Sequence, residues 1–206
     1  MHLLLPILTL IFAAAQLHAA EPAICRLLRS NYADTAHLQI DFEQSIYWSV
    51  REKTSKKRGS ATLAPGNKFR VVIGNDTWVC DGVVCSQYNN QSNQVVLRNF
   101  SDLDITTRPS HLFTTFLTNY RFEEQSRTGR EVTLVWHPDS ASSSQYTALT
   151  LTVGLPNGVV QSLKFTDTNS NIHTYLFKKT VFGTKQPEAT FEFEAPNNAH
   201  IIDNRH

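Results

Sequence analysis

A strict alternation of apolar and polar residues begins at Leu38 and leaves few choices of fold. Its apolar positions, all of one parity, are Leu38, Ile40, Phe42, Ile46, Trp48 and Val50. Successive side chains of a β-strand point to opposite faces, so a period of two over this length predicts a long strand with one buried face. Only Gln44 interrupts the row.

Short strands are predicted along most of the remaining chain, separated by turn residues such as PGN at 65–67 and PNG at 156–158. The expected strands are 59–63, 69–73, 77–80, 83–88, 94–98, 120–124, 131–137, 147–153, 159–167, 172–180 and 190–194. Strands that follow each other with few helical crossovers pair mostly antiparallel. The sequence therefore predicts a mainly β (α+β) protein with one sheet of about eleven strands, large enough to curl.

Two helices interrupt these strands. Residues 21–33 place Pro22 at a first helical position and carry apolar residues at the spacing of one helix face. Ser110 is suited to cap the second helix. The apolar side of that second helix comprises Leu112, Phe113, Phe116 and Leu117. No shift in composition divides the chain, so we expect a single domain from residue 21 to residue 206.

The first 20 residues have the pattern of a cleavable signal peptide. Residues 3–15 are apolar and uncharged, and small residues follow them up to Ala20. The apolar block is too short to span a bilayer, which needs about 20 residues. A buried N-terminal helix is the alternative interpretation, since no Lys or Arg precedes the block. We expect export and a soluble mature chain.

Charge and motif content argue against several classes of function. With 19 basic and 18 acidic residues, the chain has no excess charge suited to nucleic acid. It contains no G-x-S-x-G, H-E-x-x-H, P-loop or G-x-G-x-x-G motif. Outside the leader, no two histidines lie within four residues of each other. We therefore expect no metal, no cofactor and no enzymatic activity; an exported enzyme with an unrecognised site is the alternative.

The stretch WVCDGVVCSQY contains two of the three cysteines, Cys80 and Cys85, on either side of an Asp-Gly turn. A zinc site needs three or four ligands, and a redox motif has the spacing C-x-x-C. In an oxidising compartment, cysteines on the two arms of a hairpin favour a disulfide. We expect a Cys80–Cys85 bond and a free, partly buried thiol at Cys25.

One basic cluster lies in EKTSKKR, residues 52–58, and contains Lys53, Lys56, Lys57 and Arg58. The simpler interpretation is a solvated loop between two long strands. The alternative is a docking patch for an acidic partner or for anionic lipid head groups.

Five segments in order carry a resemblance to a known family. They are FEQS (42–45), ATLAPGNKFRV (61–71), CDGVVCSQYNNQSNQVV (80–96), TLTVGLPNGVVQSLKF (150–165) and FEFEAPNNAHIID (191–203). Together they resemble the periplasmic outer-membrane lipoprotein carriers, the LolA-like family, over nearly the whole mature chain. Each segment alone is weak, but their shared order and spacing are specific.

The resemblance implies an unclosed, strongly curved antiparallel half-barrel with helices as a lid over an apolar cavity. It implies a monomeric periplasmic carrier whose cargo is the acyl chains of lipoproteins. An inner-membrane ABC transporter would release the cargo and an outer-membrane receptor would accept it. A periplasmic lipid-binding or envelope-sensing half-barrel that does not shuttle lipoproteins is the alternative.

The same resemblance implies which apolar residues line the cavity. They are Ile40, Phe42, Ile46, Trp48, Phe69, Val71, Ile73, Leu112, Phe113, Phe116 and Leu117. Alternation alone does not separate a cavity lining from a filled core, so an ordinary core is the other interpretation. The chain departs from the family at Ala64, where the family has an Arg that holds the lid closed. Either another group such as Arg70 latches the lid, or the lid works differently.

Overall fold

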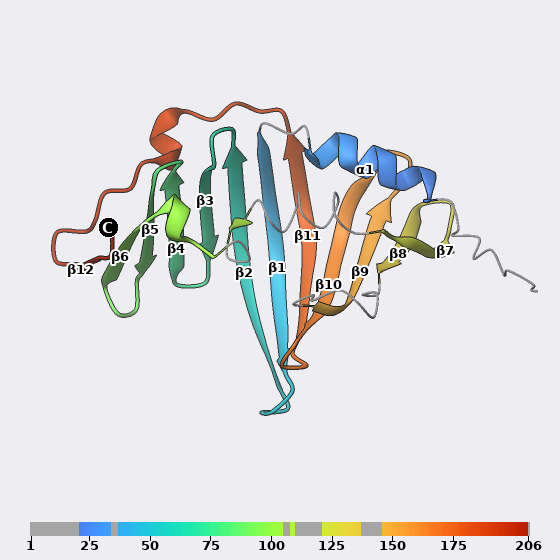
Figure 1. The fold of residues 1–206 in the computed structure, drawn as a ribbon, viewed down its shortest axis with the longest axis horizontal. Helices are drawn as coiled ribbons and strands as arrows, with labels where there is room; N and C mark the ends of the chain where they lie inside the picture. The colour runs from blue at the N-terminus through green and yellow to red at the C-terminus, as the bar shows by residue number, and fades with distance from the viewer. Residues whose placement is uncertain (1–20, 34–36, 105–107, 110–120, 137–145, 206) are drawn as a thin grey trace, which may run out of the picture.

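The computed structural model describes residues 21–33, 37–104, 108–109, 121–136 and 146–205. Within these residues the chain forms one sheet of twelve strands, in the order β12-β6-β5-β4-β3-β2-β1-β11-β10-β9-β8-β7 (Figure 1). The two end strands, β12 and β7, do not pair with each other, so the sheet is open. The predicted fold, a mainly β protein built on one unclosed sheet, is confirmed.

The elements differ in part from those expected. In chain order they are α1 (Ala23–Ala33), β1 (Leu38–Trp48), β2 (Lys53–Ala64), β3 (Lys68–Ile73), β4 (Asp76–Asp81), β5 (Val84–Asn89), β6 (Gln94–Asn99), the 3-10 helix η1 (Phe100–Asp102), β7 (Glu123–Arg127), β8 (Glu131–Trp136), β9 (Tyr146–Gly154), β10 (Val159–Asp167), β11 (Ile172–Phe182), the 3-10 helix η4 (Glu188–Phe191) and β12 (His200–Asp203). All neighbouring strands are antiparallel except β12, which runs parallel to β6.

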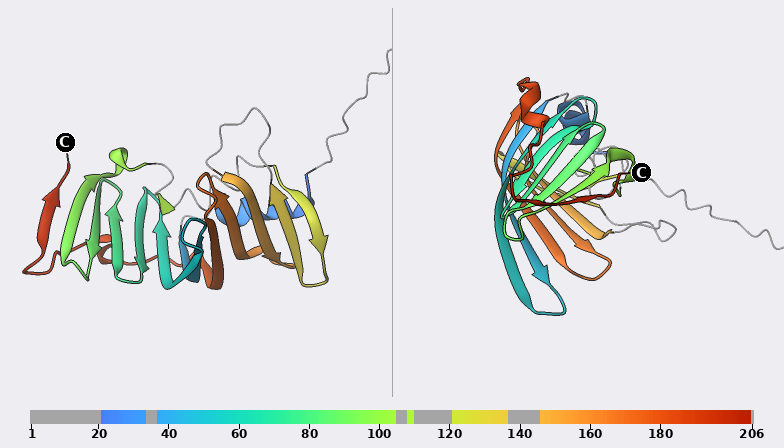
Figure 2. Two further views of the ribbon diagram at one scale, coloured as in Figure 1. Left: turned by 90° about the horizontal axis from the view of Figure 1, so that it is seen from below. Right: turned by 90° about the vertical axis from the view of Figure 1, so that its left-hand side faces the viewer.

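The sheet is strongly curved, and its two faces have different cover. The right-hand view of Figure 2 shows the curvature, with α1 and η1 on the inner side and η4 on the outer side. Because side chains alternate along each strand, one parity of each strand forms the concave face and the other the convex face.

Helix α1 packs on the concave face and forms the main core with one half of the sheet. Ile24, Leu28 and Tyr32 of α1 are buried there against Leu38 and Ile40 of β1. Strands β8, β9 and β10 add most of the remaining members of this cluster. Its largest fully buried members include Leu28, Leu134, Leu149, Val132 and Val153. The apolar positions of α1 at helical spacing therefore bury the face that the sequence predicts.

A buried hydrogen bond joins α1 to the sheet at a β-bulge. The pairing of β10 with β9 shifts register between Val160 and Ser162. At this irregularity the Val160 N–H donates to the hydroxyl oxygen of Tyr32, 2.9 Å away. The Tyr32 ring also meets Phe182 edge-on, with 5.2 Å between ring centroids. Burial raises the pKa of Tyr32 to about 12, so this hydroxyl stays neutral.

The segment after β11 crosses the convex face. Lys68 and Arg70 alternate with the concave residues of β3, so they point to the opposite side. Lys68 forms an ion pair with Glu188, and Arg70 donates to the main-chain oxygen of Thr190 at 3.2 Å. The chain then reaches β12 at the edge of the sheet (Figure 1).

The expected strand at residues 190–194 is wrong. The chain forms η4 there, and Phe191 is buried while Phe193 lies 6.0 Å from the Tyr88 ring. Phe191 and Phe193 give the sequence an alternation that mimics a strand, but their rings cover the convex face from outside the sheet. The parallel strand β12 is absent from the strands that the sequence predicts.

The expected loop at residues 52–58 is also wrong. Residues from Lys53 onward belong to β2 and pair with β1 as far as Trp48. All residues from Arg51 to Arg58 are exposed, so this half of β2 lacks the alternation that marks a half-buried strand. The β1–β2 hairpin projects past the neighbouring strands (Figure 1).

The structure contains the disulfide between Cys80 and Cys85, which lie opposite each other on β4 and β5. The bond is buried in a second, smaller core with Phe69 and Leu103. Cys25 is free and only 2% exposed. Burial raises the pKa of its thiol to about 11.

These cysteines give a first prediction. Ellman titration of the native, unreduced protein at pH 8 should find no rapidly reacting thiol, because the only free one described is buried and protonated. After denaturation without reductant, one thiol per chain should react. Three reactive thiols would refute the Cys80–Cys85 bond.

The contact of α1 with β10 gives a second prediction. Replacing Tyr32 by Phe keeps the ring but leaves the buried Val160 N–H without this acceptor. The free energy of unfolding should fall by about 1–3 kcal/mol, as measured by urea denaturation. Tyr47→Phe, at an exposed ring on β1, is the matched control and should change stability by less than about 0.5 kcal/mol. Equal stability of both variants would contradict this role for Tyr32.

Candidate functional site

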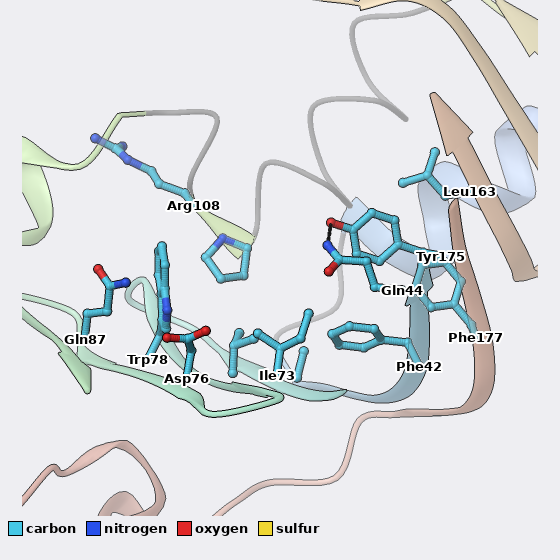
Figure 3. Close-up of a pocket in the computed structure, with 13 residues that line it drawn as sticks. Phe42, Gln44, Ile73, Asp76, Trp78, Gln87, Arg108, Leu163, Tyr175 and Phe177 are labelled. Carbon is cyan, nitrogen blue, oxygen red and sulfur yellow. Dashed lines mark hydrogen bonds between the residues drawn. The ribbon is translucent and has the colours of Figure 1, made fainter. Parts of the chain in front are cut away.

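The concave face contains a cavity of about 310 Å³ next to the part that α1 covers. Its lining residues are Phe42, Gln44, Ala61, Val71, Ile73, Asp76, Trp78, Gln87, Arg108, Pro109, Leu163, Tyr175 and Phe177 (Figure 3). They come from strands β10, β11, β1, β2, β3, β4 and β5 and from residues 108–109. The volume is at the lower end of the roughly 300–1,000 Å³ of known ligand pockets.

Strand register explains why these residues meet. Phe177 pairs with Phe42, Phe42 pairs with Gly59, and Gly59 pairs with Ile73. Paired residues share a face, so the apolar side chains of the row lie on the concave side. A parallel row runs from Ile40 through Ala61 to Val71. The cavity wall is thus built by rows that cross several strands.

Gly59 makes room for the Phe42 ring. A Cβ atom at Gly59 would lie 2.6 Å from Cζ of Phe42 and 2.6 Å from the main-chain oxygen of Val72. Both distances are far below van der Waals contact. The missing side chain lets Phe42 lie across the sheet instead of standing in the cavity.

One polar pair lies within the apolar lining. The Gln44 side-chain amide donates to the Tyr175 hydroxyl at 2.7 Å (Figure 3). Burial raises the pKa of Tyr175, so the hydroxyl is neutral at physiological pH. The Tyr175 ring packs near Phe42 and Phe165, with centroid separations of 5.8 and 6.2 Å. Gln44, which interrupts the apolar row in the sequence, therefore has a partner in this wall.

Charged groups lie at one side of the cavity. Asp76 accepts a hydrogen bond from the Asn89 side chain at 2.7 Å and lies 3.5 Å from the ammonium of Lys57. Arg108 lies 4.4 Å above the Phe100 ring and donates to the main-chain oxygen of Leu103 at 2.9 Å. A cation–π contact and a carbonyl thus hold Arg108 beside the apolar cavity.

The structure places seven of the residues expected in the cavity, and they fall in three kinds of location. Phe42, Val71 and Ile73 line it. Ile40 and Phe69 are buried in the two cores. Ile46 is partly buried and Trp48 is exposed, farther along β1 towards the hairpin end. Leu112, Phe113, Phe116 and Leu117 lie outside the described residues.

Sequence reasoning missed Tyr175 and Phe177, which form much of the second wall. A signal was present, because His173, Tyr175 and Phe177 alternate within the predicted strand at 172–180. Trp78 and Leu163 were also missed. Their rows reach the cavity only through cross-strand pairing, which the sequence does not display.

The basic cluster does not form one patch. Lys56 and Arg58 share the convex face of β2, where Arg58 lies 3.3 Å from Glu43. Lys57 lies on the other face and pairs with Asp76 at the cavity. Lys53 is nearest the hairpin end. The proposed latch, Arg70, is on the convex face and contacts Thr190, away from the cavity.

The described residues contain no group of three or more His, Cys, Asp or Glu that could hold a metal ion. They do contain one His–Asp pair, in which His173 lies 3.1 Å from Asp167 and stacks on Phe165 with 4.6 Å between ring centroids. In the same part of the chain, no helix has the length and hydropathy needed to cross a membrane.

Comparison with known families decides the assignment. Residues 33–194 match the family model described as outer membrane lipoprotein carrier protein LolA. The chain belongs to the LolA family. Proteins of this family are periplasmic carriers rather than enzymes, and the open, curved sheet with its apolar concavity is consistent with that membership.

Solved structures resemble this LolA-family chain at low sequence identity. An uncharacterized conserved protein from Thermus thermophilus shows the same fold, with 14% identity and a TM-score of 0.56 over 88% of this chain and 97% of that one. A LolA superfamily protein from Nitrosomonas europaea is 10% identical, with a TM-score of 0.43, over 82% and 96% of the two chains. The MucA/MucB complex of Pseudomonas aeruginosa matches at 14% identity and a TM-score of 0.34, over 82% and 59%. Among curated proteins, none matches.

Gly59 gives the prediction for this site. Gly59→Ala should lower the free energy of unfolding by about 1–3 kcal/mol, because the new methyl group must displace Phe42 or the β3 main chain. Urea denaturation measures this change. Gly129→Ala is the matched control, since a Cβ at Gly129 meets nothing within 4 Å. If both variants were equally stable, Phe42 would not depend on the space above Gly59.

Proposed function

We propose that the cavity binds acyl chains of lipoproteins and that the protein carries them through the periplasm. The observation that supports this most directly is an apolar cavity on the concave face of a LolA-family sheet. It is lined chiefly by aromatic and aliphatic side chains, and the described residues around it offer no metal cluster. Such a site favours a ligand that is apolar and is not chemically changed.

Transfer of acyl chains out of water supplies the driving force. Each buried CH₂ group contributes about 0.8 kcal/mol, so a lipidated protein needs a shielding partner in an aqueous compartment. A carrier must also release its cargo, which favours a small, open cavity over a deep enclosed one. In the proposed route an inner-membrane ABC transporter loads the monomeric carrier, and an outer-membrane receptor unloads it.

The polar groups around the cavity suit the head of such a ligand. A lipoprotein acyl chain ends in ester or amide carbonyl groups, which accept hydrogen bonds. Arg108 lies at the cavity, whereas position 64, where the resemblance expects an Arg, has an alanine. We assign to Arg108 the role of a cation near the ligand head, and Arg70 is too far around the sheet for it.

A pair of variants on one strand tests the cavity. Ile73→Glu places a carboxylate in the lining, so displacement of a fluorescent fatty acid should show at least tenfold weaker binding. Val72→Glu, on the opposite face of the same strand, is the matched control and should bind as the unchanged protein does. Far-UV circular dichroism should show the same β signal for both variants. Equal fatty-acid binding by both would contradict an acyl-binding cavity.

Cargo transfer separates shuttling from simple lipid binding. The unchanged protein should co-purify with lipidated proteins and lose them to outer-membrane vesicles that contain a receptor. Fatty-acid binding without any lipoprotein transfer would instead support a lipid-binding or envelope-sensing role for the same cavity.

A further inference from the structure

The end of the β1–β2 hairpin combines exposed apolar side chains with exposed basic ones. Val50 is 93% exposed, and Tyr47 and Trp48 are more than one third exposed. These residues lie at the end that projects past the neighbouring strands (Figure 1). Single exposed apolar residues are ordinary, but three within four positions at one projecting end are not.

The apolar residues at this end do not belong to one face of the sheet. Trp48 has the parity of the concave row, Tyr47 has the opposite parity, and Val50 lies in the turn beyond β1. A protein partner that packs on one face of a sheet would contact side chains of only one parity. An end with apolar side chains on both faces is instead suited to insertion, end first, into an apolar medium that contacts both faces.

Basic residues lie on both faces of this end. Residues 47–58 contain five basic residues and one acidic residue, Glu52. Lys57 and Arg58 pair with acidic groups on neighbouring strands. Within the described part of the chain, Arg51, Lys53 and Lys56 have no carboxylate within ion-pair distance. The free cations are therefore the ones closest to Val50.

Polar contacts hold the end in place, and among the three exposed apolar side chains only that of Trp48 takes part in them. The Ser49 N–H donates to the Asn171 side-chain oxygen at 3.1 Å, and the Ser49 hydroxyl donates to the main-chain oxygen of Asn169 at 2.8 Å. The Trp48 indole N–H donates to the Ser55 hydroxyl at 3.0 Å. The turn between β10 and β11 thus supports the hairpin. Val50 makes none of these contacts, so they give no reason for an apolar residue at this exposed position.

We infer that the β1–β2 hairpin end is a membrane-contact site for a bilayer surface that contains anionic lipids. Tyr and Trp favour the interface between head groups and acyl chains, and valine gains free energy below it. Arg51, Lys53 and Lys56 supply the complementary charge for the head groups. The site is separate from the cavity, so this inference does not depend on the proposed function.

Vesicle sedimentation tests the inference with purified protein that lacks residues 1–20. Vesicles of phosphatidylcholine with 30% phosphatidylglycerol should sediment the protein, and pure phosphatidylcholine should sediment little. Binding should weaken as salt rises, because salt screens the exposed charges. Equal sedimentation with both compositions, or none with the anionic one, would overturn the inference.

Two sets of variants locate the contact. Val50→Asp should weaken sedimentation at least tenfold, whereas Val83→Asp, at the 69%-exposed turn residue between β4 and β5, should not.

The triple variant Arg51→Gln/Lys53→Gln/Lys56→Gln should weaken sedimentation roughly 100-fold. Its charge-matched control is Lys164→Gln/Lys179→Gln/Lys185→Gln, at exposed lysines elsewhere. If the Val50 or triple variant bound like its control, the hairpin end would not be the contact.

Two further readouts separate insertion of the hairpin end from binding through the cavity or through charge alone. Brominated lipids should quench part of the tryptophan fluorescence, and Trp48→Phe should remove that part; undiminished quenching in the variant would overturn the inference.

Ile73→Glu should sediment as the unchanged protein does, and its failure to do so would assign the attraction to the cavity. Release by soluble polyglutamate together with unaffected binding of Val50→Asp would indicate an acidic protein partner instead.

Discussion

An open sheet of this size has a long apolar face to remove from water, and the one α-helix described covers only part of it. Where α1 packs, apolar residues from β1 and β8–β10 form a filled core. A cavity borders this core, and Phe42, Ala61 and Leu163 belong to both. The hydrophobic effect therefore acts on both regions, but among the described residues only the first is covered by a helix.

Contacts between neighbouring strands shape the cavity. Gly59 lets the Phe42 ring lie across the sheet, and the Gln44–Tyr175 hydrogen bond fixes two side chains that would otherwise present unpaired polar groups. Arg108 is held by the Phe100 ring and a carbonyl oxygen. Each contact uses a neighbour on another strand, so the shape of the cavity depends on the register of the whole sheet.

Much of the architecture is predictable from the sequence, and the exceptions have physical reasons. Alternation identifies β1 and the succession of antiparallel strands. The first half of β2 is not predicted, because Lys53 and its neighbours are exposed on both faces and show no alternation. Residues 190–194 alternate like a strand, yet Phe191 covers the sheet from outside. Alternation also cannot separate Ile40 from Phe42, since both belong to the main core and only Phe42 also lines the cavity.

The segment between β11 and β12 has a mechanical consequence. It leaves the sheet near its middle, crosses the convex face through Lys68 and Arg70, and rejoins it beside β6 at one edge. Seventeen residues, 183–199, thus join two points of the same sheet by a path of limited length. This segment therefore covers the outer side of the β1–β6 half, whereas the β7–β10 half has no such outer segment among the described residues. The two halves thus respond differently to a change in curvature, because α1 packs on the inner side of one and this segment lies on the outer side of the other.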